Sequence, residues 1–296
     1  MPILGIFASS MKGATTFFSA ARRLVTNTAY SSNGTSWTAG TSPSASRWIK
    51  MTYGANTYVM VAEGPSTNAA SSTDGITWTA RTLPASAEWG YGLEFGGGVF
   101  ATTSQGSTNA ASSTDGITWT ARTTPSAANW YAMGYGGGVF ALAATASTSA
   151  ASSTDGTSWT ARTMPSASDW REIAYGASTF VAVAATGTPS ATSTNGTSWT
   201  ARTMPSATWQ GVEYGAGLFV AVAGSSTDAA TSPDGITWTS RTLPTSNNWV
   251  RVVFSNGVFV ATATATANAA SSTDGITWTS RTLPTSGNWY AIAGKN

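Results

Sequence analysis

One short motif recurs along the whole chain at almost constant spacing. It reads Ser-x-Asp/Asn-Gly-x-Thr/Ser-Trp, and its acidic or amide residue is Asn33, Asp74, Asp115, Asp155, Asn195, Asp234 and Asp274. The spacings are 41, 41, 40, 40, 39 and 40 residues, and a second Trp follows each motif by ten or eleven residues. These two positions account for all 14 tryptophans. A fixed period of this length predicts a repeat architecture in which each unit buries its faces against its neighbours.

Each repeat has the pattern of four short strands. The second Trp opens an alternating run such as 170–175, which we call segment A, and a turn rich in Gly leads to segment B, such as 180–184. Segment C, such as 109–114, leads into the motif, whose Asp-Gly or Asn-Gly pair is a strong hairpin signal because Gly tolerates positive φ. Segment D follows and stops at a Pro, which cannot donate to a strand ladder.

This pattern predicts an all-β fold, a seven-bladed β-propeller with four antiparallel strands in each blade. The chain ends on an A segment at 289–293 and begins on a B segment at 16–20, so the C-terminal strand should complete the first blade and close the ring. Residues 13–296 form the propeller in this interpretation. Residues 1–12 remain as an N-terminal arm for attachment or assembly.

Composition excludes several kinds of site. The chain has no Cys and no His, which removes thiol and imidazole nucleophiles, disulfides and the usual zinc sites. We therefore expect no cofactor, no metal and no catalytic residue. Only 9% of the residues are charged, the net charge is +2, and six of the 14 Lys and Arg occupy one repeated position, so nucleic-acid binding is not expected. No stretch of 18 apolar residues exists, so no membrane insertion is expected, and Met1 to Ser10 is a poor match to a signal peptide.

The motif and its context resemble the Asp-box (BNR, sialidase-like) propeller repeat. The residues that carry the resemblance are Trp209 to Val222 and Ser232 to Thr239, and it extends over residues 16–294. The variant is similar to repeats of bacterial surface proteins and of bacteriophage structural proteins. The opening Ile3 to Ser10 also resembles the starts of some phage tail and virion proteins. The resemblance implies a propeller and a structural protein of a virion, but such propellers carry many activities.

Three repeated positions are interpreted as structural. The seven Asp and Asn residues of the motif should accept backbone hydrogen bonds within their turns. An Arg follows the motif Trp by three residues in six copies, at Arg81, Arg122, Arg162, Arg202, Arg241 and Arg281, and should stack on an aromatic ring or bond a carbonyl. Tyr53, Tyr135, Tyr175 and Tyr214 share a position with Phe95 and Phe254, so their hydroxyls are dispensable and the rings should be core.

Positions where the copies disagree are the candidates for function. They cluster at the start of segment A and in the B-to-C turn, which should share one face around the mouth of the channel. The candidate ligand-binding residues on this face are Lys50, Tyr91, Tyr131, Arg171, Glu172, Gln210, Arg251 and Tyr290. Aromatic and charged groups of this kind suit a sugar or a peptide. The alternative is neutral variation on a solvated loop face.

These observations lead to an expected function. We expect a non-enzymatic bacteriophage virion protein, a tail or head decoration or fibre, on the extracellular surface of the particle. It would bind a host surface or a receptor glycan through the variable face, and other virion proteins through the N-terminal arm, in several copies per assembly. One alternative is a sialidase-type glycoside hydrolase, for which Glu94, Glu172 and Glu213 are the acids that could face the channel. The other alternative is an architectural virion spacer that binds nothing.

Overall fold

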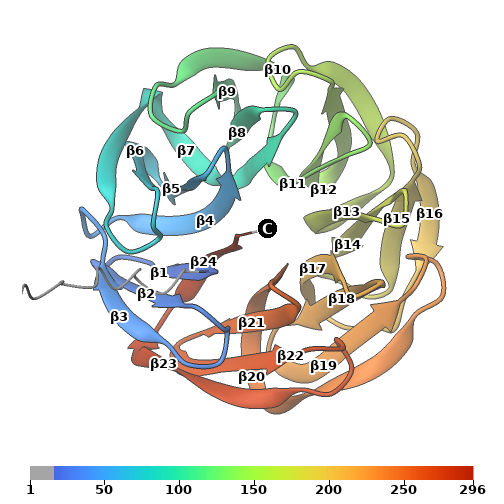
Figure 1. The fold of residues 1–296 in the computed structure, drawn as a ribbon. Coiled ribbons are helices and arrows are strands. Elements are labelled where there is room, and N and C mark those ends of the chain that lie inside the picture. The colour runs from blue at the N-terminus through green and yellow to red at the C-terminus, as the bar shows by residue number, and fades with distance from the viewer. Residues whose placement is uncertain (1–16, 296) are drawn as a thin grey trace, which may run out of the picture.

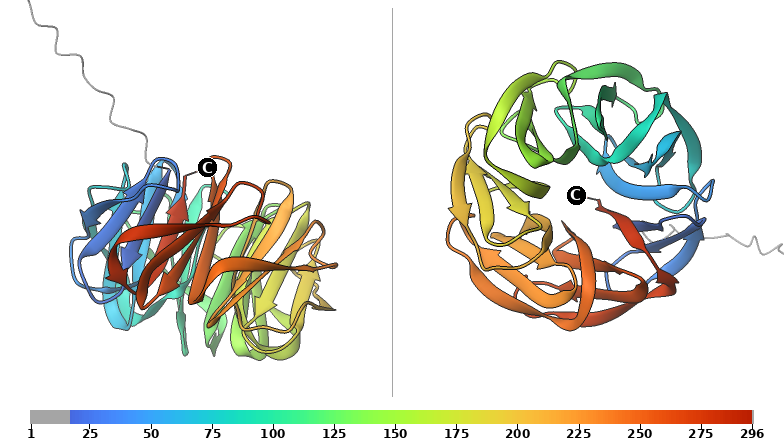
Figure 2. Two further views of the ribbon diagram at one scale, coloured as in Figure 1. Left: turned by 90° about the horizontal axis from the view of Figure 1, so that it is seen from below. Right: turned by 180° about the vertical axis from the view of Figure 1, so that it is seen from behind.

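The computed structural model describes residues 17–295, all of whose regular elements are β-strands. The sheets are arranged radially, and consecutive elements follow one another around a central axis (Figures 1 and 2). The predicted arm, residues 1–12, lies outside the described residues.

Twenty-four strands form four antiparallel sheets. The first contains, in spatial order, β24 (Trp289–Gly294), β1 (Phe18–Arg22), β2 (Asn27–Ser31) and β3 (Thr38–Thr41). The second contains β10 (Thr120–Ala128), β9 (Ser107–Ser113), β8 (Val99–Gln105), β7 (Thr79–Gly96), β6 (Pro65–Ser72), β5 (Thr57–Glu63) and β4 (Arg47–Gly54). The third contains β11 (Trp130–Gly136), β12 (Val139–Ser153), β13 (Thr160–Gly176), β14 (Thr179–Ala184), β15 (Pro189–Ser193) and β16 (Thr200–Thr203). The fourth contains β17 (Trp209–Gly215), β18 (Leu218–Ala223), β19 (Ser226–Ser232), β20 (Thr239–Ser255), β21 (Val258–Thr264), β22 (Thr266–Ser272) and β23 (Thr279–Gly287).

The predicted arrangement of seven separate four-stranded blades is therefore wrong. The structure has 24 strands, the number that six sets of four would contain, and they form four sheets. The physical reason is that some connections keep extended backbone. For example, β7 pairs with β6 through its first half and with β8 through its second half, so it holds a D segment and the next A segment without a break. The strands β13 and β20 do the same, and β12 joins a B segment to a C segment.

The two ends of the chain meet in one sheet, as the sequence predicts. Strand β24 pairs with β1 from Phe18 opposite Gly294 to Arg22 opposite Trp289. The Lys295 amide also donates to the Phe17 carbonyl. This pairing covers the edge of β1 that would otherwise be unpaired.

Aromatic side chains pack each repeat onto its neighbour. The ring of Tyr135 lies on Gly96, where an added Cβ would come within 2.0 Å of the Tyr135 Cγ. The same contact joins Gly54 to Phe95 and Gly136 to Tyr175. Within its own repeat the Tyr135 ring contacts Phe140 at a centroid distance of 4.6 Å. These rings are packed between repeats, as their interchange with Phe predicts.

The second Trp of each repeat is fully buried and bonds to the D-to-A connection. For instance, Trp89 Nε1 donates to the Ala85 carbonyl at 2.8 Å, and Trp209 Nε1 to the Pro205 carbonyl at 2.9 Å. The indole therefore fills the core and also satisfies a carbonyl of the connection.

The Arg residues that follow each motif Trp are structural as well, but through a contact that the sequence did not predict. Each Arg donates its Nε to a hydroxyl of the neighbouring strand, as Arg122 does to Ser112 at 2.9 Å.

The motif turns follow the predicted scheme. Asp115 Oδ1 accepts the amides of Ile117 at 2.8 Å and Thr118 at 2.9 Å, while Ser113 Oγ bonds the Gly116 amide. These backbone hydrogen bonds, with that of Thr118 the largest, lower the pKa of Asp115. Asn33 Oδ1 accepts the corresponding pair of amides, so the carboxylate charge is not required for the turn.

This equivalence predicts how Asp115 variants behave. The substitution Asp115→Asn keeps the acceptor and should change the free energy of unfolding little. Asp115→Ala removes the acceptor for two amides and should cost about 0.5–1.5 kcal/mol for each lost bond, at the lower end because the turn is exposed. Denaturant unfolding of the two variants checks this. Equal losses for both would show that the charge, not the hydrogen-bond acceptor, stabilises the turn.

Candidate functional site in the central channel

A cavity of about 280 Å³ lies on the axis of the ring and is lined by A segments from several repeats. Alternate residues of a strand point to the same side, so Lys50 and Thr52 of β4 both line the cavity. The other polar side chains that line it are Glu94 of β7, Glu172 of β13, Glu213 of β17 and Arg251 of β20. The channel thus collects polar groups from distant parts of the sequence, as far apart as Lys50 and Arg251.

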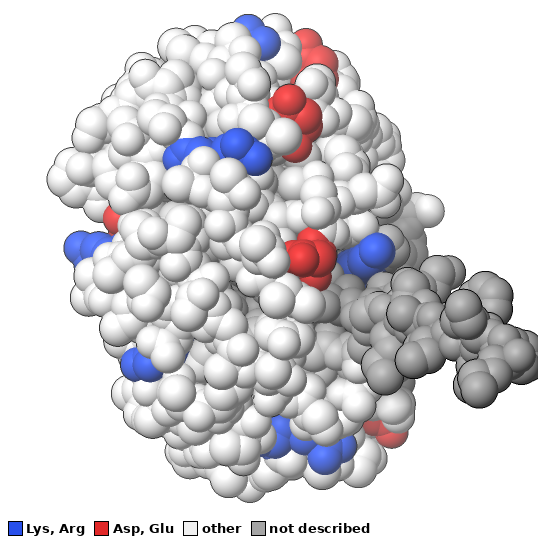
Figure 3. Space-filling model, turned by 60° about the vertical axis from the view of Figure 1, so that its left-hand side comes forward, with Lys and Arg blue, Asp and Glu red and all other residues white. Residues whose placement is uncertain are grey.

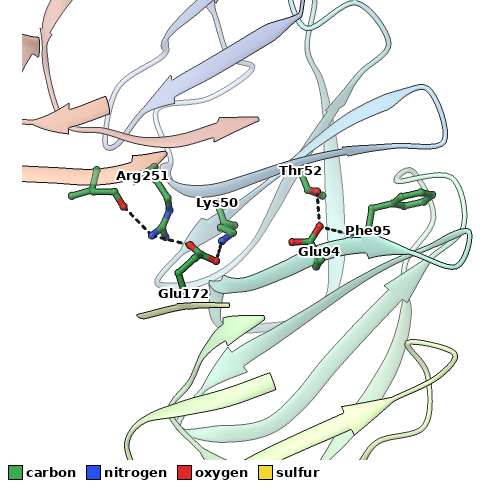
Figure 4. Close-up of polar contacts among 7 residues, drawn as sticks. Lys50, Thr52, Glu94, Phe95, Glu172 and Arg251 are labelled. Carbon is green, nitrogen blue, oxygen red and sulfur yellow. Dashed lines mark hydrogen bonds and ion pairs between the residues drawn. The ribbon is translucent and has the colours of Figure 1, made fainter. Parts of the chain in front are cut away.

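Three of these residues form an ion triad across the channel. Lys50 Nζ lies 2.6 Å from Glu172 Oε1, and Arg251 Nη1 lies 3.4 Å from Glu172 Oε2 (Figure 4). Arg251 Nη1 also donates to the Val250 carbonyl. All three side chains are at most 10% exposed, so removing one partner would leave a buried charge without compensation. The Nε of Arg251 is buried without a hydrogen-bond partner in the described part of the chain.

Two further carboxylates lie in the same cavity without a cation in contact. Glu94 Oε1 accepts the Phe95 amide at 3.0 Å and the Thr52 hydroxyl at 3.4 Å (Figure 4). Glu213 Oε1 accepts the Tyr214 amide at 3.0 Å. No ion pair involves either carboxylate among the described residues.

Burial raises the pKa of both carboxyl groups toward neutrality. The pKa of Glu94 rises to about 7, because desolvation and the charge of Glu172 outweigh the opposing effect of Lys50 and of the hydrogen bonds. Burial also raises the pKa of Glu213 to about 8, with the nearby Glu94 and Glu172 charges acting in the same direction. Near neutral pH both the protonated and the ionised forms of these two groups are therefore populated, so each can donate or accept a hydrogen bond.

The eight predicted ligand-binding residues do not form one site: three line the channel and five lie outside the cavity. Lys50, Glu172 and Arg251 lie inside the channel as the triad, where they are 6–8% exposed, and are not on a solvated mouth. Tyr91, Tyr131 and Arg171 do not line the cavity, and neither do Gln210 and Tyr290.

Three of the other predicted residues, Tyr91, Tyr131 and Arg171, form a compact stack near the starts of the A segments. The rings of Tyr91 and Tyr131 are 4.2 Å apart, and the Arg171 guanidinium lies 4.8 Å from the Tyr131 centroid on its ring face. Tyr91 also donates to Glu63 Oε1 at 2.7 Å, and Glu63 is paired with Arg23 and Arg47. The aromatic ring faces that the sequence suggested for sugar binding are therefore largely in contact with neighbouring side chains.

Sequence reasoning missed Thr52 and placed Glu94 and Glu213 only in the hydrolase alternative. The signal was present in the alternation of the strand, because these residues lie two positions after the variable position of Lys50, Glu172 and Arg251. The corresponding position in the other repeats is uncharged, for example Gly134 and Val253. A comparison of the repeats at alternate residues of the A segments would have identified Thr52, Glu94 and Glu213 as residues that face the axis.

Other kinds of site receive no support from the described residues. Residues 17–295 contain no group of three or more metal-binding side chains placed to hold an ion. No helix long and apolar enough to cross a membrane occurs in this part of the chain. On the face seen in Figure 3 the charged side chains are scattered among uncharged ones and form no continuous basic patch.

Comparison with known proteins establishes the propeller fold. No family model matches the sequence, and no curated protein matches it. A streptogramin B lyase structure is 14% identical, with a TM-score of 0.74 over 84% of this chain and 87% of that one. Virginiamycin B lyase from Staphylococcus aureus is 12% identical, with a TM-score of 0.71 over 80% and 85%. YCF48 bound to D1 peptide is 17% identical, with a TM-score of 0.61 over 80% and 81%.

These similarities correct the expectation that the protein is not an enzyme. Two of the similar structures are lyases, so the fold gives no ground for excluding catalysis. Their identity of 12–14% shows the fold alone. A virginiamycin B lyase variant with one His replaced by Ala is catalytically inactive, and this chain contains no His. The chain is a propeller protein built from the repeats that its sequence shows.

The raised pKa values of Glu94 and Glu213 predict a pH dependence of stability. The folded protein holds these protons at pH values where the unfolded chain, with a carboxyl pKa near 4.5, has lost them. Their contribution to stability is therefore complete below about pH 4.5 and is lost as the pH rises through about 7 and 8. The free energy of unfolding should fall between pH 5 and 8.5, and less steeply in a Glu94→Gln/Glu213→Gln variant.

Denaturant unfolding at several pH values measures this dependence. Glu88→Gln is the matched control, because Glu88 is exposed and does not line the cavity. An unchanged slope in the double variant, or an equal change in the control, would contradict the assignment of the two protons to the channel.

Proposed function

We propose that this protein is a carbohydrate-binding propeller of a bacteriophage particle and that its central cavity holds part of a host-surface glycan. The observation that carries the proposal is the cavity with two carboxylates, Glu94 and Glu213, that are not paired with a cation. Only two of the repeats place a carboxylate at this position, and the fold does not require it there. Small-ligand sites are typically concave and combine a few such convergent polar groups with apolar walls.

The chemistry of the lining suits hydroxyl groups. Each carboxylate uses one oxygen for a backbone amide, while the second oxygen has no hydrogen-bond partner among the described residues. Carboxylate oxygens accept hydrogen bonds from sugar hydroxyls, and Met51, Val212 and Val252 supply apolar surface beside them. The cavity therefore replaces the exposed mouth as the proposed binding place, because the Tyr91–Tyr131–Arg171 stack is occupied by its own contacts.

The placement on a virion is part of the same proposal. It rests on the resemblance of the repeats to the Asp-box repeats of phage structural proteins and on a chain rich in Ser, Thr and Ala with no Cys. The proposed partners are other virion proteins, bound through residues 1–12, which lie outside the described residues. A virion protein of this kind is extracellular and present in several copies.

The proposed arm can be tested separately from the cavity. A chain lacking residues 1–12 should fold, because the described sheets begin at Phe18, but should fail to enter the assembled particle. Circular dichroism measures folding, and the protein content of purified particles measures incorporation. Normal incorporation would refute the assignment of the arm.

A second candidate function is cleavage of a glycosidic bond. The observation in its favour is that Glu94 and Glu213 share one cavity with pKa values of about 7 and 8, as expected of carboxyl groups that transfer protons near neutral pH. Glycoside hydrolysis uses such a pair, one as acid and the other as base or nucleophile. The lyases among the similar folds show that a propeller can carry catalysis.

A glycan array probed with the full chain tests the leading proposal. Binding should fall at least tenfold in Glu94→Gln/Glu213→Gln, remain in Glu88→Gln, and remain in Tyr131→Phe, which preserves the ring stack. Release of reducing sugar from the bound glycan, measured in parallel, distinguishes cleavage from binding. Loss of binding in Tyr131→Ala and Arg171→Ala, with no effect of the double variant, would return the site to the mouth. Absence of any binding would favour the architectural spacer, or a peptide ligand as in YCF48 with its D1 peptide.

A further inference from the structure

The ion triad forms the closed end of the cavity. Lys50, Glu172 and Arg251 come from β4, β13 and β20, which lie on different sides of the ring, and their contacts bridge the channel (Figure 4). They are the lining residues nearest to the starts of their A segments. The residues that precede them, such as Arg171 and Val250, do not line the cavity.

The stack of Tyr91, Tyr131 and Arg171 lies beyond the triad and adds to this closure. Tyr131 is close enough to Arg251 and Glu172 for their charges to influence its pKa, which burial raises. The other lining residues, including Tyr53, Phe254 and Gly294, adjoin the ends of the A segments. The cavity therefore occupies the half of the channel next to the A-to-B turns, where Lys295 lies over the Tyr53 ring.

The volume limits what can enter. About 280 Å³ is at the lower limit of the range of roughly 300–1,000 Å³ that is typical of drug-sized ligands. A blind cavity of this size admits the end of a chain but cannot let a chain pass through. A glycan must therefore present a terminal unit.

The charges limit the kind of terminal unit. Both cations in the cavity already contact Glu172, whereas Glu94 and Glu213 have no cation in contact. Above about pH 8, where both acids are ionised, a carboxylate or sulfate on the ligand would meet two negative charges, and the only cations that line the cavity, Lys50 and Arg251, already contact Glu172, so like charges would repel there. Hydroxyl or ammonium groups would instead donate to them.

We propose that the cavity binds the terminal unit of a glycan chain, and that this unit is neutral or carries an amine and is not an acidic sugar. This inference rests on the proposed function, whose cavity it uses. It excludes a sialoside as the ligand, although the repeats resemble those of sialidases.

The first experiment compares matched glycans on the full chain. At pH 8.5, where Glu94 and Glu213 are ionised, a glycan that binds should lose at least tenfold in affinity when its terminal unit is capped with sialic acid and should keep binding when capped with a neutral sugar. The methyl glycoside of the terminal unit should compete, whereas an internal fragment should not. Equal or better binding of the acid-capped glycan, or competition by the internal fragment, would overturn the inference while leaving glycan binding intact.

The second experiment needs no glycan, because the chain has no Cys and a single thiol can be introduced. Thr52→Cys places the thiol in the cavity, and Thr82→Cys places one on an exposed strand outside it. Positively and negatively charged methanethiosulfonates of similar size report the local charge. Relative to Thr82→Cys, Thr52→Cys should favour the positive reagent at least fivefold at pH 8.5, and adding Glu94→Gln/Glu213→Gln should abolish that preference. A preference for the negative reagent would overturn the inference. The predicted preference without binding of any glycan would instead refute only the proposed function.

Discussion

The packing of an aromatic ring on the glycine of the preceding repeat determines how the sheets can be arranged. In five interfaces a Cβ on that glycine would lie within about 2.2 Å of a ring carbon, so only glycine allows the approach. Each ring then contacts a second aromatic residue of its own repeat, as Tyr175 contacts Phe180. Repetition of one close contact around the ring brings all the A segments to a common axis, and the channel is a consequence of this packing.

The channel explains why each A segment carries both structural residues and candidate functional residues. Residues of an A segment that face the neighbouring repeat are constrained by the contact between an aromatic ring and a glycine. Alternate residues of the same segment face the axis, where they meet no partner that recurs in every repeat. Their residue types differ from one repeat to the next, and in this chain they include three carboxylates and two cations. Three of them, Lys50, Glu172 and Arg251, form the triad. The remaining two, Glu94 and Glu213, have raised pKa values, and each has one oxygen without a hydrogen-bond partner among the described residues.

Two predictions from the sequence were wrong: the seven separate four-stranded blades and the exclusion of enzymatic activity. The sequence predicted that each D segment stops at a Pro, but extended backbone continues through several D-to-A connections, so the strands form four sheets, three of which have more than four strands. The absence of His and Cys removed familiar catalytic groups, but it says nothing of carboxylates that burial has brought to a neutral pKa. The similarity to lyase folds makes the same point for the architecture as a whole.

The sequence by itself determined the repeat, the four-segment pattern within it, the closure by the last strand, and the structural roles of the motif Asp, the Arg row and the Tyr row. These features depend on local hydrogen bonds or on contacts that recur in every unit, so one period is enough to predict them. Only the tertiary structure decided which residues share the axis. Lys50 and Glu172 are 122 positions apart, and their contact depends on the diameter of the ring and on the pairing register of two separate strands. No local pattern contains that information. For this reason three residues that the sequence placed at an exposed mouth form a buried triad in the structure, and only the structure shows Glu94 and Glu213 in the cavity without a cation in contact.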